Sequence, residues 1–128
     1  MKANELMIGD WVYSTFYDKP CKVIGIEQNE SEYVNVKVTN VTGAKDINSL
    51  YFIPLTAEIL EKNGFNYLNI TDVWIWREGS SLPIHLDNYN EDGWRLLINC
   101  DNIPCECKFV NQLQHALRLC GIKKEIEL

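Results

Sequence analysis

The fold is indicated most clearly by the stretch Tyr33-Val34-Asn35-Val36-Lys37-Val38-Thr39. Its valines alternate with polar residues, so an extended chain would be apolar on one side and polar on the other, as in a half-buried β-strand. Aromatic and β-branched residues predict similar strands over 10–16, 22–28 and 47–53, with turns at 18–20 and 41–44. Four short antiparallel strands favour a meander or a small SH3-like barrel.

Helical patterns follow in the second half. Thr56 can cap a short helix that Gly64 ends, because glycine adopts the left-handed conformation after a helix at little cost. A longer helix is predicted over 109–120. Its apolar stripe consists of Phe109, Val110, Leu113, Ala116, Leu117 and Cys120, and its polar side consists of Asn111, Gln114, His115 and Arg118.

Three more strands are predicted between the two helices, over 72–77, 82–88 and 94–100. Asp92-Gly93 is a typical hairpin turn between the last two of them. The tail over 125–128 alternates in polarity and is expected to add an edge strand. The fold class is therefore α+β, with the longer helix packed on an antiparallel sheet. A length of 128 residues suits a single domain, 1–128, with a β-rich half over 1–55 and an α+β half over 56–128.

The net charge is −6, from 12 Lys and Arg against 18 Asp and Glu. An acidic chain disfavours non-specific binding to nucleic acid, which depends on clustered basic residues. The polar start Met1-Lys2-Ala3-Asn4-Glu5 does not resemble a signal peptide, and the longest strongly apolar run, Leu50-Tyr51-Phe52-Ile53-Pro54-Leu55, is far too short to span a bilayer. A cytoplasmic protein with no membrane partner is expected, and its five cysteines are expected to be reduced.

Three blocks of the sequence, 5–12, 53–65 and 112–121, resemble a group of small proteins of gut bacteria that often travel with prophage-like or other mobile elements. The blocks read ELMIGDWV, IPLTAEILEKNGF and QLQHALRLCG. This resemblance implies a common origin and a shared fold, and it carries no established activity, cofactor or catalytic residue. Asn111 stands where that group commonly has His, which weakens any role of the third block in proton transfer.

The cysteines raise the possibility of a metal site. Zinc could be bound by Cys100, Cys105 and Cys107 together with Cys120 or His115. The spacing does not match the paired knuckles of structural zinc sites, and His115 and Cys120 lie 140° apart around a helix. The favoured interpretation is that Cys100 and Cys120 are small apolar core residues, and a redox-sensitive thiol at Cys105 or Cys107 is a weaker alternative. No metal and no cofactor are expected.

Other candidates for chemistry are few. His85 and His115 are expected on polar faces at the surface. Asp87, Glu91 and Asp92 cluster around one hairpin, where an acidic turn is a simpler interpretation than acid–base catalysis or cation binding. The glycines form no phosphate-binding loop, and no nucleophile elbow is present.

The aromatic residues are the most suggestive feature. Trp74 and Trp76 are expected on one face of their strand, with Val73 and Ile75 on the other and Arg77 next in the chain. Trp and Arg are enriched at the centres of protein interfaces, although a core position is the favoured interpretation for the two tryptophans taken alone, because Trp is highly buried on average. The sequence thus favours a non-catalytic protein-binding module with Trp74, Trp76 and Arg77 as anchors. The alternatives are a nucleic-acid-associated protein that uses the SH3-like half, and a small metalloprotein or enzyme.

Overall fold

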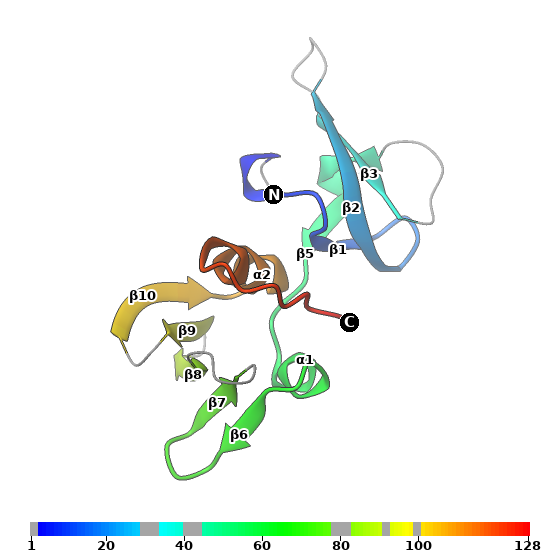
Figure 1. Cartoon of the computed structure of the whole chain (residues 1–128). Helices are drawn as coiled ribbons and strands as arrows, with labels where there is room; N and C mark the ends of the chain where they lie inside the picture. The colour runs from blue at the N-terminus through cyan, green and yellow to red at the C-terminus, as the bar shows by residue number, and fades with distance from the viewer. Residues whose placement is uncertain (1–2, 29–33, 40–44, 78–82, 91–92, 99–100) are drawn as a thin grey trace. The chain divides into compact units, whose positions relative to one another are not determined.

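A computed structural model describes residues 3–28, 34–39, 45–77, 83–90, 93–98 and 101–128. The chain forms two compact units, Met1–Ile53 and Pro54–Leu128 (Figure 1). Each contains an antiparallel sheet, and the second also contains both α-helices. The predicted α+β class is confirmed.

The first unit is built from five strands in the order β4-β3-β2-β1-β5. A short 3₁₀ helix, η2, comes directly before the last strand. The elements are η1 (Ala3–Glu5), β1 (Trp11–Ser14), β2 (Lys19–Gln28), β3 (Val34–Val38), β4 (Lys45–Asp46), η2 (Ile47–Ser49) and β5 (Leu50–Phe52).

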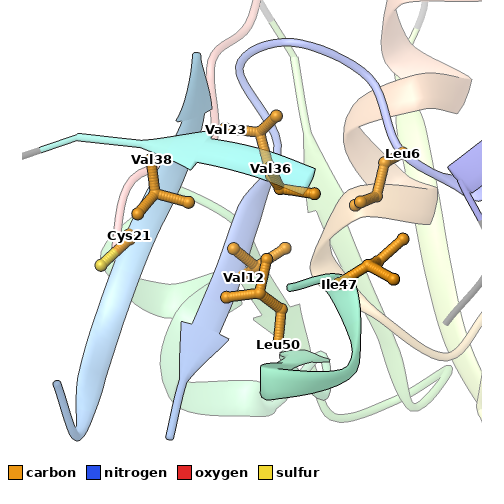
Figure 2. Close-up of a cluster of buried hydrophobic side chains, with 8 residues drawn as sticks. All are labelled: Leu6, Val12, Cys21, Val23, Val36, Val38, Ile47 and Leu50. Atoms are coloured by element: carbon orange, nitrogen blue, oxygen red, sulfur yellow. The ribbon is translucent and has the colours of Figure 1, made fainter. Parts of the chain in front are cut away.

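The core of the first unit is apolar, because alternate residues of the strands point inward. Val36 and Val38 of β3 are fully buried, which confirms the inward face read from the alternating valines. Figure 2 shows the side chains of several strands converging on one cluster. Its members are Leu6, Val12, Cys21, Val23, Val36, Val38, Ile47 and Leu50.

Two predictions for the first unit are wrong in detail. Residues 18–20 do not form the turn: it lies at 15–18, and Pro20 already pairs with Tyr13 inside β2. The expected strand over 47–53 begins with η2 instead, because the Asp46 carboxylate accepts the amide of Asn48 and the Ser49 hydroxyl donates to the Asp46 carbonyl. Local side-chain bonds of this kind compete with strand pairing. The expected turn over 41–44 lies outside the described residues.

The second unit contains five strands in the order β10-β9-β8-β7-β6 (Figure 1). The elements are α1 (Ala57–Lys62), β6 (Asn66–Leu68), β7 (Val73–Trp76), β8 (Ile84–Asn90), β9 (Gly93–Ile98), β10 (Asp101–Cys107) and α2 (Val110–Leu119). The strands β6 and β10 were not predicted. They flank the three predicted strands and form the edges of the sheet.

The two faces of this sheet differ in burial. One face carries Trp74, Leu86 and Leu96 in one row of paired residues, and Leu86 and Leu96 are buried. The other face carries residues such as Ile75 and His85, which are half-buried. Helix α1 contacts β6, and α2 contacts β10. The predicted packing of the C-terminal helix on a sheet is confirmed.

Both helices begin and end as local chemistry requires. The Thr56 hydroxyl accepts the amide of Ile59 at 3.3 Å, which confirms the predicted cap of α1, and Gly64 follows with φ of 84°. The side-chain carbonyl of Gln112 accepts the amides of Lys108 and Phe109 at the start of α2. Gly121 ends that helix with φ of 73°.

The polar side predicted for α2 is only partly exposed. Asn111 and Gln114 are 3% and 4% exposed, whereas Cys120, expected in the apolar stripe, is exposed. Gln114 was expected at the surface, but the C-terminal tail covers its side chain. The side-chain amide of Gln114 donates to the carbonyl of Lys124 at 2.9 Å and accepts the amide of Ile126 at 2.7 Å. Cys120 lies beyond the last full turn of α2, so the helix no longer directs it toward the sheet.

The tail does not form the expected edge strand. A second side-chain amide holds it instead. Asn63 donates to the carbonyl of Glu127 and accepts the amide of Glu127, both at 2.7 Å. Between the two amide side chains Ile126 is 1% exposed. Asn63 and Gln114 thus hold the tail from two different parts of the chain.

Candidate functional site

The same tyrosine–aspartate hydrogen bond occurs in two β-hairpins, and one of these hairpins lies at the candidate site. In that hairpin the hydroxyl of Tyr67, in β6, donates to the carboxylate of Asp72 just before β7. In the first unit the hydroxyl of Tyr13, in β1, donates to the carboxylate of Asp18 just before β2. Both aspartates have positive φ, 53° for Asp72 and 51° for Asp18. Aspartate tolerates this left-handed conformation better than most residues, so it suits the tight turn in both hairpins.

A cavity of about 310 Å³ opens beside the hairpin that carries Tyr67 and Asp72. Four neighbouring strands each contribute one residue, Tyr67 from β6, Trp74 from β7, Asn88 from β8 and Trp94 from β9. Ala57 at the start of α1 and Asp72 complete the lining. Among these described lining residues three are aromatic, and Asp72 contributes the one acidic side chain. We call this cavity the aromatic pocket.

The aromatic rings of the pocket are held in place by their surroundings. The rings of Tyr67 and Trp74, which are cross-strand partners, have centroids 5.3 Å apart and planes inclined by 42°. Trp94 is 8% exposed, and its indole N–H donates to the carbonyl of Leu55 at 2.9 Å. This bond fixes the ring against the segment that enters α1. The pocket therefore has a preformed aromatic wall.

The three residues predicted to bind a partner occupy different places. Trp74 is half-buried and lines the aromatic pocket. Trp76 lies on the same strand face, but its ring packs near Phe65, with centroids 6.4 Å apart, and the ammonium of Lys124 lies 5.5 Å from its centroid. Arg77 is exposed just after β7. The structure thus connects Trp74 with Tyr67, Asp72, Asn88 and Trp94, which the sequence analysis did not select.

One sequence signal could have identified part of this set. Tyr and Asp recur at a spacing of five, as Tyr13 and Asp18 before the predicted strand over 22–28, and as Tyr67 and Asp72 at the start of the predicted strand over 72–77. A single such pair is common in any sequence, but the repetition marks a hairpin device. Trp94 could not be found in this way, because its place in the pocket depends on the pairing of β8 with β9.

The Asp72 carboxylate controls the ionisation of Tyr67. The hydrogen bond from the phenol to this carboxylate is the main cause that raises the pKa of Tyr67 above its usual value of 10.0, and the nearby negative charge acts in the same direction. The same arrangement raises the pKa of Tyr13 beside Asp18. Both phenols therefore remain neutral hydrogen-bond donors at physiological pH.

A spectrophotometric titration of the tyrosines tests this link. Because the folded-state pKa is raised, the bond stabilises the fold below the unfolded pKa, and this contribution disappears as the pH rises through the folded pKa. We expect Asp72→Asn to lower the pKa of Tyr67 and to leave that of Tyr13 unchanged, and Asp18→Asn to do the reverse. Unchanged phenolate titration curves in both variants would contradict the assignment.

The cysteine and histidine candidates do not converge in the described part of the chain. Cys107 is buried in β10, Cys120 is exposed after α2, and Cys21 is buried in the first unit. Cys100 and the side chain of Cys105 lie outside the described residues. Among the residues that the structure describes, no group of three or more His, Cys, Asp and Glu side chains is placed to hold a metal ion.

The remaining ionisable candidates are accounted for by the sheet. His85 points away from Ile84 and Leu86 as predicted, and its face is mixed: its cross-strand neighbours Ile75 and Leu97 are apolar, and the next pair on that face is charged. His115 is half-buried on α2. Asp87 is paired with the guanidinium of Arg95 at 2.7 Å, while Glu91 and Asp92 lie outside the described residues.

Comparison of the chain with models of protein families, with curated proteins and with solved structures finds no match. Within the described ranges, no helix is long and apolar enough to cross a bilayer.

Proposed function

We propose that this protein is a non-catalytic intracellular binding module, an accessory protein of a mobile element that holds a partner protein through its second unit. The observation that carries the proposal is the aromatic pocket, in which Trp74 lies beside Tyr67 and a buried Trp94 also lines the cavity. A concave aromatic site that is already formed loses little side-chain entropy on binding, as is typical of the central residues of protein interfaces.

The surroundings of the pocket support a macromolecular partner. Leu68 and Ile70, in the hairpin that carries Tyr67 and Asp72, are 44% and 95% exposed. Arg77 is exposed at the far end of β7 and can donate several hydrogen bonds to a partner. Trp76, which lies between Trp74 and Arg77, would support this surface through its packing with Phe65 and Lys124.

Recovery of the tagged protein from its native host, followed by quantitative mass spectrometry, tests this function. Trp74→Ser should lose at least one co-purifying protein while its circular dichroism spectrum stays folded, and Arg77→Ser should weaken the same interaction. Tyr51→Ser removes an exposed aromatic side chain from the first unit and serves as the matched control. A partner profile that is identical for all variants, or a Trp74→Ser chain that does not fold, would contradict the proposal.

A second candidate function has one observation in its favour. The outward faces of β1 and β5 carry Trp11, Tyr13 and Tyr51, and the ammonium of Lys22 lies 5.0 Å from the centroid of Trp11. Of these rings Tyr51 is exposed and the other two are half-buried, and accessible rings beside lysines are typical of proteins that stack the bases of single-stranded nucleic acid. This alternative, a nucleic-acid-associated protein, would show salt-dependent binding of an oligonucleotide that depends on Trp11 and is independent of Trp74.

A further inference from the structure

The aromatic pocket has the composition of a site for a cation. Aromatic rings have negative faces, and a site made of several rings recognises alkylated ammonium groups through cation–π attraction. Tyr67, Trp74 and Trp94 supply three such rings around one cavity. The Tyr67 and Trp74 planes are inclined to each other, so they form two walls of a concave surface.

The charge of the pocket also favours a cation. Asp72 is exposed, its carboxylate accepts the Tyr67 hydroxyl, and the described residues that line the cavity include no lysine, arginine or histidine. A carboxylate at the edge of an aromatic site adds Coulomb attraction for a cation and repels an anion. The second unit as a whole is acidic, since residues 54–128 contain 7 Lys and Arg against 11 Asp and Glu.

The neighbouring tryptophan shows that this sheet face accepts an ammonium group. Trp76, two residues along β7 from Trp74 and on the same face, has the Lys124 ammonium 5.5 Å from its ring centroid. Among the described residues no such cation lies over the ring of Trp74. Of these two tryptophans, Trp76 thus has the fold's own lysine over its ring, whereas Trp74 lines a cavity.

We propose that the aromatic pocket binds an alkylammonium group, namely a lysine side chain of the partner protein. This inference rests on the proposed function and names the chemistry of that same site. A cavity of about 310 Å³ lies at the lower end of ligand-binding cavities and suits the end of one side chain. The exposed Leu68 and Ile70 of the same hairpin provide contact area for the rest of a protein surface, which a free small amine would not use.

Titration of the full chain with small probes tests the cation. Choline, its neutral carbon isostere 3,3-dimethylbutan-1-ol, and N-acetyl-lysine methylamide in unmodified and trimethylated forms are compared by tryptophan fluorescence and by the NMR shifts of the probe methyl groups. We expect the cations to bind about tenfold more tightly than the neutral isostere, with their methyl resonances shifted upfield by the rings. Equal affinity for choline and its isostere, or no binding of any cation, would overturn the proposal.

Matched variants locate the site. Asp72→Asn removes the charge but keeps a residue that tolerates the left-handed turn, and we expect it to weaken choline binding several-fold. Asp18→Asn makes the identical change in the other hairpin and should leave the affinity unchanged. Trp74→Leu should abolish binding, whereas Trp11→Leu should not. An Asp72→Asn variant with undiminished affinity would overturn the assignment of the carboxylate.

The same titrations distinguish a lysine side chain of a protein from a free small amine as the source of the ammonium group. Tighter binding of either lysine derivative than of choline supports a protein side chain, and the reverse result assigns the pocket to a free small amine and overturns the proposed occupant. If no cation binds but Trp74→Ser still loses a partner protein, cation binding is rejected and the proposed protein-binding function is retained. Cation binding with an unchanged partner profile would reject the protein-binding function.

Discussion

Replacing Trp94 by alanine is expected to lower the free energy of unfolding by about 3–5 kcal/mol, the range found for large aromatic residues in cores. Trp94 is 8% exposed and is the most buried ring of the aromatic pocket. Its indole N–H also donates to the carbonyl of Leu55, whose own amide donates to the carbonyl of Lys108. The substitution removes both the ring and the bond that holds the segment before α1.

Trp94→Phe separates these two contributions. Phenylalanine keeps most of the apolar contact but cannot donate to Leu55, so we expect a loss of about 1–3 kcal/mol. Trp11→Ala is the control, because Trp11 lies half-buried on the outer face of β1. Urea unfolding followed by circular dichroism measures all three variants. A Trp94→Ala chain no less stable than Trp11→Ala would show that Trp94 is not a structural wall of the pocket.

Replacing Gln114 by methionine is expected to release the C-terminal tail and to cost about 2–4 kcal/mol, because two hydrogen bonds are lost and a buried amide of the tail loses its acceptor. Methionine has a similar volume and cannot bond to Lys124 or Ile126. Ile126, 1% exposed in the fold, would then become accessible. The two bonds to Asn63 and the ion pair of Arg118 with Glu125 would remain.

Hydrogen exchange and urea unfolding measure this effect together. The amide of Ile126 should exchange much faster in Gln114→Met, and that of Glu127 should follow in Asn63→Ala. Gln28→Met changes an exposed glutamine of the first unit and should leave both observables unchanged. Protected tail amides in Gln114→Met would show that the hydrophobic contacts of Ile126 hold the tail without the glutamine.

Local sequence was sufficient wherever a pattern of neighbouring residues fixes the backbone. The valines of β3, the Thr56 cap, the glycine after each helix and the length of α2 were all read correctly, because capping and periodicity act within a few residues. The strands β6 and β10 were not predicted. The three residues of β6 are too few to show a period, and β10 is bulged and contains Pro104, which is unusual within a strand.

For the candidate site, too, local sequence determined one part and the tertiary structure determined the rest. Trp74 was selected from its strand pattern, and the sequence by itself determined that it shares a face with Trp76. Only the tertiary structure decided that Trp74 meets Tyr67, Asn88 and Trp94, because those residues come from four strands whose register depends on pairing distant parts of the chain. It likewise decided that Gln114 is buried, because the tail that covers it returns to α2 through hydrogen bonds that no helical pattern encodes.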